Sequence, residues 1–192
     1  MIVLGFDTSA AHCAAAIWKD GQTIEERREP MKRGQAERLM GLIEDVLSAQ
    51  SIKWCDLDAI GVGIGPGNFT GIRICVSAAR GLALGLGIPA IGVDRFDVIE
   101  ANSVETGVPS VPATQDNLYI RQAGHDPKLV NRIEAENVGE TLIFDAEGTN
   151  PAIAIAQIAA SRISTQHPRP APLYIKAADA APARDAPPTI LP

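Results

Sequence analysis

Hydrophobic and polar positions follow two different periods in the first part of the chain. Short apolar runs at residues 2–6 and 13–18 predict two buried strands, and residues 23–29 follow an Asp-Gly turn signal as a third strand. Residues 35–50 instead place apolar side chains three and four positions apart, which predicts an amphipathic helix. The chain is therefore expected to begin with an antiparallel meander that leads into a helix.

Thin apolar runs separated by helical segments come next. Residues 59–64 and 88–93 are nearly uncharged, as is typical of strands buried in a parallel sheet. A helix rich in Ala, Gly and Leu is predicted at 70–86, and a short helix capped by its first residue, Asp94, at 94–101. The order β-β-β-α-β-α-β follows, which indicates the α/β fold class.

The pattern is weaker in the second half of the chain, where most of the prolines fall. Two strands are predicted at 111–113 and 118–123, joined by a polar turn, and a third at 141–144. The helix expected at 151–164 begins with proline, which is favoured at the first helical position. The Ala/Pro/Asp-rich segment 177–188 is expected to be flexible.

Composition and charge narrow the class of protein. The 192 residues are 46% hydrophobic, which is enough to bury a sizeable core. The formal net charge is −6 and neither half is basic, which disfavours stand-alone binding to a nucleic-acid backbone. Cys13, Cys55 and Cys75 lack paired spacing, and each is expected to be a buried, inert thiol. Because the N-terminus does not resemble a signal peptide and the apolar stretch 81–93 is too short to span a membrane, a cytoplasmic protein is expected.

Two polar turns that follow predicted strands could carry chemistry. Asp7, Thr8 and Ser9 could hold a phosphate or a magnesium shell, or could simply cap their own turn. The loop 65–71, Gly-Pro-Gly-Asn-Phe-Thr-Gly, opens a helix whose free N–H groups could bind an anion. A tight strand-to-helix connection is the alternative, because the loop lacks the lysine of a Walker A motif and the glycine spacing of a dinucleotide fingerprint.

Candidate catalytic and metal-binding residues are sparse. His12, His125 and His167 are scattered, and none has a second His or Cys at metal-ligand spacing. The sequence also has no Gly-x-Ser-x-Gly nucleophile elbow. We therefore expect no catalytic and no metal-binding residues. Basic residues near the two helices are either solvated charges or the rim of an interface: Lys32, Arg33, Arg73 and Arg80.

Several motifs resemble the TsaB (YeaZ) family, the non-catalytic subunit of bacterial threonylcarbamoyladenosine tRNA modification. They lie at 4–9, 34–39, 62–73, 80–83 and 87–89. The Gly-Pro-Gly-x-Phe-Thr-Gly-x-Arg run is the most specific of them, although Asn68 stands where that family usually has Ser. The resemblance is strong over the first hundred residues and thinner afterwards.

The resemblance implies an actin-like (ASKHA) fold of two ribonuclease H-like lobes, with the second lobe reduced. The order of elements predicted above agrees with the first lobe of such a fold. The expected division is residues 1–102 for the first lobe, 103–176 for the reduced second lobe and 177–192 for a Pro/Ala-rich tail.

The resemblance also implies partners rather than an intrinsic cofactor. The main partner would be a TsaD-type subunit, which transfers a threonylcarbamoyl group to N6 of adenosine 37 of tRNA. A TsaE-type ATPase and a TsaC/Sua5-type enzyme would complete the pathway, with tRNA contacted indirectly and no membrane involved. ATP or ADP would be bound only in the complex, and a homodimer would compete with the heterodimer. The metal-binding His-x-x-x-His helix of the TsaD-type subunit has no counterpart in this chain.

The docking surface implied by the resemblance comprises the predicted helices and the loop between them. The residues assigned to it are Arg33, Glu37, Met40, Gly65, Pro66, Gly67, Asn68, Phe69, Thr70, Gly71, Arg73, Ser77 and Arg80. Two enzymatic alternatives stay open. One is an ATP-dependent small-molecule kinase that uses Asp7 and the 65–71 loop with Mg-ATP and needs a second phosphate loop, for which 145–148 is the only candidate. The other is a glycoprotease-type peptidase, for which the histidine pair is missing.

Overall fold

A computed structural model describes residues 1–164 and 168–175, so the predicted tail at 177–192 lies outside the described residues. The first part of the chain forms a five-stranded sheet in the order β3-β2-β1-β4-β5. β1 pairs antiparallel with β2 and parallel with β4. The strands are β1 (Ile2–Asp7), β2 (His12–Lys19), β3 (Gln22–Pro30), β4 (Ala59–Gly63) and β5 (Ala90–Val93).

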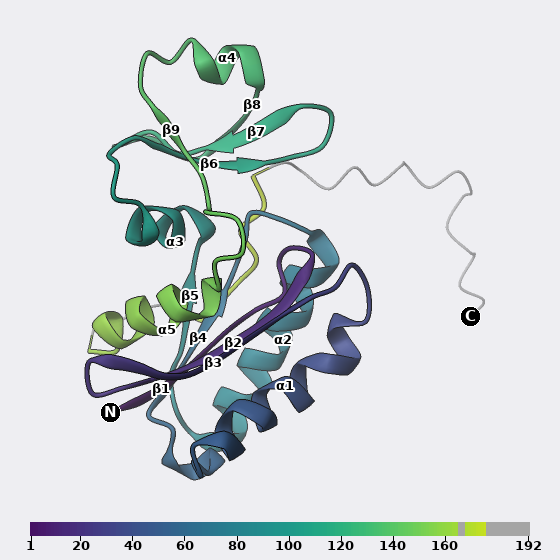
Figure 1. The fold of residues 1–192 in the computed structure, drawn as a ribbon, viewed down its shortest axis with the longest axis vertical. Helices are drawn as coiled ribbons and strands as arrows, with labels where there is room; N and C mark the ends of the chain where they lie inside the picture. The colour runs from purple at the N-terminus through teal and green to yellow at the C-terminus, as the bar shows by residue number, and fades with distance from the viewer. Residues whose placement is uncertain (165–167, 176–192) are drawn as a thin grey trace, which may run out of the picture.

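Helices cover both faces of this sheet (Figure 1). α1 (Gln35–Ala49) and α2 (Phe69–Leu86) pack on one face, where Leu4 and Phe6 of β1 join the largest apolar cluster. Alternate residues of β1 face α5 (Pro151–Arg162) on the other side. A Cβ on Gly5 would collide with the carbonyl oxygen of Ala152, so glycine lets α5 lie close to the sheet.

A smaller four-stranded sheet lies beyond α3 (Arg95–Asn102), at the top of Figure 1. Its order is β8-β7-β6-β9, and β6 pairs antiparallel with β7 and parallel with β9. Its elements are β6 (Val108–Pro112), β7 (Asn117–Ile120), β8 (Lys128–Asn131), α4 (Arg132–Glu136) and β9 (Leu142–Ile143). After β9 the chain returns to the first sheet as α5, so the second sheet is inserted between two parts of the first body.

The predicted order β-β-β-α-β-α-β is confirmed, with only the 3-10 turn Trp54–Asp56 added. The second half differs more. β8 and α4 have no counterpart among the predicted elements, and β9 is shorter than the strand expected at 141–144. The division of the chain at residue 102 stays a prediction. That division assigns α5 to the second lobe, but α5 packs on the first sheet.

Among the described residues, α2 is the one helix whose length and apolar composition would allow it to cross a membrane. Residues 81–93, the apolar stretch expected to be too short for a membrane span, begin inside α2 and end in β5. They therefore miss the apolar N-terminal part of this helix. One side of α2 packs into the core through Ile72, Cys75 and Ala79. This packing accounts for much of its apolar character.

Candidate functional site

Asp7 ends β1 and is almost fully buried. One carboxylate oxygen, Oδ2, accepts three hydrogen bonds. They come from the Ser9 backbone N–H (3.1 Å), the Ser9 hydroxyl (2.9 Å) and the His12 ring Nε2 (2.7 Å). Because Ser9 and His12 both converge on Asp7, the turn is held by its own side chains, as one of the two sequence readings expected.

Burial and hydrogen bonding act in opposite directions on Asp7. Burial raises the pKa of this carboxyl, but the hydrogen bonds and charge of His12, the Ser9 hydroxyl and the charge of Arg95 outweigh burial, so the pKa is lowered from its ordinary value. The second oxygen, Oδ1, is buried without a hydrogen-bond partner among the described residues. It lies against Gly63, where a Cβ would collide with it. A glycine at the end of β4 is therefore needed to keep this carboxylate in place.

The loop 65–71 packs directly on the turn at Thr8 and Ser9. The Asn68 N–H donates to the Ser9 carbonyl (2.6 Å), and the Thr8 hydroxyl donates to the Gly71 carbonyl (2.6 Å). A Cβ on Gly67 would collide with the Ser9 carbonyl, and one on Gly71 with the Thr8 carbonyl. These contacts explain why the motif needs glycines: the backbone of the loop lies too close to the backbone of the turn to leave room for a side chain.

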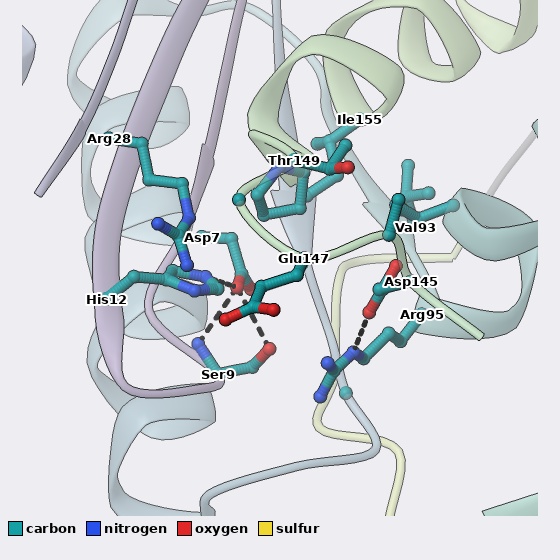
Figure 2. A pocket seen from close by; sticks show the side chains of 16 residues that line it. Asp7, Ser9, His12, Arg28, Val93, Arg95, Asp145, Glu147, Thr149 and Ile155 are labelled. Carbon is teal, nitrogen blue, oxygen red and sulfur yellow. Dashed lines mark hydrogen bonds and ion pairs between the residues drawn. The ribbon is translucent and has the colours of Figure 1, made fainter. Parts of the chain in front are cut away.

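A cavity of about 170 Å³ opens beside Asp7, between the first sheet and the loop that precedes α5 (Figure 2). Arg28 of β3 reaches it from the edge of the sheet. On the opposite side, Arg95 of α3 donates through Nε to Asp145 (2.6 Å). Glu147 belongs to the same loop as Asp145 and turns its carboxylate toward this cavity. Cations and anions therefore meet in one small space.

This arrangement joins segments that the sequence separates. Asp7 and Ser9 were candidates from the start, and the segment 145–148 was the only candidate for a second phosphate loop; both line the same cavity. His12 was considered only as a metal ligand, although its spacing of five residues from Asp7 spans the turn between β1 and β2. Arg28 and Arg95 were missed, because only the strand pairing and the α3 position bring them here.

Metal binding has little support in the part of the chain that the structure describes. No group of three or more His, Cys, Asp or Glu side chains there could hold a metal ion. His125 is exposed and its Nδ1 lies 3.0 Å from the Ala123 carbonyl oxygen. Cys75 is buried, and burial raises the pKa of its thiol to about 12, as expected for an unreactive thiol. The expectation that Cys55 is buried is wrong, because Cys55 lies exposed in the 3-10 turn Trp54–Asp56.

A second candidate site is the outer side of α2. At its N-terminal end Phe69 stacks on Tyr174, with ring centroids 4.9 Å apart. The Arg73 guanidinium lies 3.8 Å from the centre of the Phe69 ring, and its Nε donates to the Tyr174 hydroxyl (2.9 Å). Tyr174 was missed among the candidate residues, because only the folded chain brings the segment 168–175 alongside α2.

The residues predicted to form the docking surface divide by exposure. Gly65, Pro66 and Gly71 are buried by this chain itself, and Gly67 is half-buried. The exposed members lie on α1, on α2 or next to them: Arg33, Glu37, Met40, Asn68, Phe69, Thr70, Arg73, Ser77 and Arg80. On α2 these positions recur three or four residues apart, so they form one outward stripe.

The same stripe continues to the C-terminal end of α2 with residues that the sequence reading did not assign. Leu84 is 85% exposed, the highest value for a large apolar side chain of the first sheet and its helices. Gly81 and Gly85 are exposed, and a Cβ on either would meet open space. The stripe therefore combines apolar, small and basic side chains, and we call Phe69, Arg73, Ser77, Gly81, Leu84 and Gly85 the α2 stripe.

Comparison with known proteins places this geometry in context. The family model described as TsaD, tRNA N6-adenosine threonylcarbamoyltransferase, matches residues 28–179. The Escherichia coli protein named tRNA threonylcarbamoyladenosine biosynthesis protein TsaB is 39% identical over 96 residues, which are 50% of this chain and 41% of that protein. The Haemophilus influenzae protein of the same name is 28% identical over 127 residues, 64% of this chain and 53% of that protein. The chain thus spans about half the length of the curated relatives it matches.

Solved structures show the same fold. A Pseudomonas aeruginosa protein described as similar to the peptidase YEAZ has a TM-score of 0.74, with 21% identity, and the match covers 91% of this chain and 99% of that one. A second structure, YeaZ from the same organism, has a TM-score of 0.68. Together with the curated relatives, these likenesses confirm the resemblance drawn from the motifs and the actin-like, ribonuclease H-like fold class.

Proposed function

Because the chain belongs to the family described as TsaD, tRNA N6-adenosine threonylcarbamoyltransferase, we propose that it acts in threonylcarbamoyladenosine formation on tRNA. Its part would be that of a non-catalytic subunit, which binds and supports a TsaD-type subunit. The names of the TsaB relatives support the pathway. The observation that supports a binding role is the exposed α2 stripe.

Two exposed glycines of α2, Gly81 inside the helix and Gly85 in its last turn, argue for a partner. Gly81 and Gly85 are exposed and leave open space around the position of a Cβ, so the packing of this chain does not require them. A glycine in the interior of a helix, as Gly81 is, costs roughly 0.5–1 kcal/mol relative to alanine. Small side chains let a second helix approach closely, which offsets this cost when a partner is bound.

The side chains around the two glycines suit a protein interface. Phe69 and Leu84 supply apolar area at the two ends of the stripe, and Arg73 adds an arginine held in place by two aromatic rings. Aromatic residues and arginine are enriched where interfaces gain most of their binding free energy. The mechanism we propose is therefore docking, in which the α2 stripe binds the catalytic subunit and stabilises its active conformation.

The buried polar cluster gives less support to the enzymatic alternatives. The glycoprotease-type alternative would need a histidine pair, whereas His12 is the single histidine among the described residues that line the cavity, and its ring donates to Asp7 Oδ2. For the kinase alternative, the loop at 145–148 brings the carboxylates of Asp145 and Glu147 to the cavity. Asp145 is already paired with Arg95, and the loop is not a glycine-rich segment of the kind whose backbone N–H groups bind phosphates.

The remaining members of the system are part of the same proposal. A TsaE-type ATPase would join the complex, a TsaC/Sua5-type enzyme would supply the threonylcarbamoyl adenylate, and tRNA would be contacted through the catalytic subunit. ATP or ADP would bind in the complex rather than to this chain alone. A homodimer through the α2 stripe would compete with the heterodimer, and the complex would work in the cytoplasm.

The test is co-elution of the full chain with the TsaD-type subunit of its own organism in size-exclusion chromatography. Leu84→Asp should abolish co-elution, because it replaces the most exposed apolar side chain of the α2 stripe with a charge that the contact would bury. Ile133→Asp is the matched control, since Ile133 of α4 is also exposed (72%) but lies on the second sheet, and it should co-elute normally. A wild-type chain that does not co-elute, or a Leu84→Asp chain that does, would overturn the proposal.

A further inference from the structure

Three exposed arginines on or beside α2 form no ion pair with any described residue. They are Arg73 and Arg80 of α2 and Arg169 of the segment 168–175, and we call them the arginine surface. Ion pairs with Asp or Glu occur instead at Arg27, Arg38, Arg95, Arg121, Arg132 and Arg162. Among the described residues, the charge of the arginine surface is therefore not neutralised by the chain itself.

The segments that carry the arginine surface contain no acidic residue. Residues 59–93, which include α2, have no Asp or Glu, and neither do residues 168–175. On the neighbouring helix α1, Asp45 pairs with Arg27 and Arg38 rather than with α2. Because the whole chain has a net charge of −6, this basic surface is a local exception. A negatively charged surface on a partner would be complementary to it.

The Arg73 guanidinium is held in a fixed orientation. It lies over the Phe69 ring, and its Nε donates to the Tyr174 hydroxyl (2.9 Å). Tyr174 is positioned by the residue before it, because the Leu173 N–H donates to the Ile64 carbonyl (2.8 Å). The two terminal nitrogens of Arg73 have no hydrogen-bond partner among the described residues. A guanidinium held in this way can bind a carboxylate through two parallel hydrogen bonds, with little loss of side-chain freedom on binding.

The other two arginines flank a groove at the far end of α2. This groove has a volume of about 490 Å³ and lies between the second half of α2 and residues 168–170. Arg80 and Arg169 line it, and Leu84 and Ile88 give it apolar walls. Arg80 is seven positions after Arg73, so the two side chains lie on the same side of the helix, about 10 Å apart along its axis.

We propose that the arginine surface binds an acidic face of the TsaD-type subunit. One carboxylate of that subunit pairs with Arg73, and a second lies between Arg80 and Arg169. Tyr174 is a positioning residue, because it acts by orienting Arg73. The inference rests on the proposed docking function and adds the chemistry of the partner surface.

An RNA backbone would also supply negative charge, but the surroundings of the arginines favour a protein. Leu84 is 85% exposed and Phe69 is 40% exposed, and both lie on the same helix as Arg73. Apolar and aromatic side chains next to arginine are typical of the centre of a protein interface. The acidic remainder of the chain would repel a nucleic-acid backbone.

The experiment measures the Kd between the full chain and the TsaD-type subunit of its own organism by calorimetry in 50 and 300 mM NaCl. We expect weaker binding at the higher salt concentration, because salt screens exposed charges. Arg73→Glu and Arg80→Glu should each weaken binding at 50 mM NaCl by about tenfold or more. Lys128→Glu is the matched control, since it makes the same change in charge at an exposed residue of β8, and it should bind like the parent chain.

Two conservative variants test the geometry at Arg73. Arg73→Lys keeps the charge but loses the planar fork, and it should weaken binding by about threefold or more. Tyr174→Phe keeps the aromatic ring but loses the hydroxyl that accepts from Arg73, and it should weaken binding in the same direction. A merely structural role for Tyr174 predicts instead a changed thermal unfolding midpoint and an unchanged Kd.

Several results would overturn the inference. Parent-like binding by both arginine-to-glutamate variants, or a Kd that does not change with salt, would leave docking intact but remove the acidic partner surface. Saturable binding of a tRNA transcript to the isolated chain that is lost in Arg80→Glu would assign the arginine surface to RNA. A parent chain that does not bind the TsaD-type subunit would instead refute the docking function itself. If circular dichroism shows that Arg73→Glu does not fold, Arg169→Glu provides the second charge reversal.

Discussion

At the scale of single residues, Asp7 shows how one buried carboxylate organises a turn. Its hydrogen-bond partners are the neighbouring Ser9 and His12. The sequence could place Asp7 at the end of a strand, because an apolar run stops there. It could not show that Gly63, more than fifty positions away, provides the space for this side chain.

The lowered pKa of Asp7 makes a pH-dependent prediction. The pKa of this carboxyl is lower in the folded chain than in the unfolded chain, where it is about 3.9. Such a group stabilises the fold at pH values above the unfolded pKa. This stability is lost as the pH falls through the folded pKa. In urea unfolding between about pH 6 and pH 3, Asp7→Asn should therefore show a smaller loss of unfolding free energy than the parent chain. Identical pH profiles for the two chains would contradict the assigned role of Asp7.

At the scale of elements, α2 carries glycines of two kinds. Gly71 faces the Thr8 carbonyl at the start of the helix, whereas Gly81 faces open space further along. The sequence pattern treats both as small residues of one helix. The reason for the difference lies in the fold, since only Gly71 has the backbone of another segment against it.

The same substitution should therefore have opposite effects at these two glycines. Gly71→Ala should lower the unfolding free energy by about 2 kcal/mol, because the new methyl group collides with backbone that cannot easily move. Gly81→Ala should raise it by roughly 0.5–1 kcal/mol, because alanine favours the helix and meets nothing. Equilibrium unfolding in guanidinium chloride measures both. A destabilising Gly81→Ala in the isolated chain would show that α2 packs differently.

How far the sequence predicts the elements depends on how local their signals are. The helices at 35–49 and 69–86 follow from apolar spacing along one face, which is a local property. The strand at 128–131 was missed because its only buried residue is Val130 and its pairing with β7 is not visible in a short window. The packing of α5 on the first sheet depends on contacts between residues far apart in the sequence, which no local pattern predicts.

At the scale of the whole molecule, an ion-pair cluster ties the second sheet to the first body. Arg121, just after β7, donates to both oxygens of Asp94 (3.0 Å each), to Asp97 (2.7 Å) and to Glu100 (3.0 Å). Arg162 of α5 also reaches Asp97 at 2.6 Å. Three elements therefore meet at the acidic face of α3.

Removing the central arginine should loosen this junction. Arg121→Gln leaves partly buried carboxylates facing one another and should destabilise the chain by roughly 1–2 kcal/mol, a range already reduced for solvent screening. Thermal unfolding measures the change. Arg132→Gln is the control, because its ion pair with Asp116 is exposed and should matter little. Equal effects of the two substitutions would argue against a special role for Arg121.

The insertion of the second sheet has a consequence for the order in which the chain can fold during synthesis. One face of the first sheet, including Gly5 and Gly61, is covered by α5, which the ribosome makes only after the whole second sheet. Until residue 162 has emerged, that face has no cover from its own helix, and exposed sheet surface favours aggregation. A nascent chain of this protein therefore depends on α5 to complete its first domain.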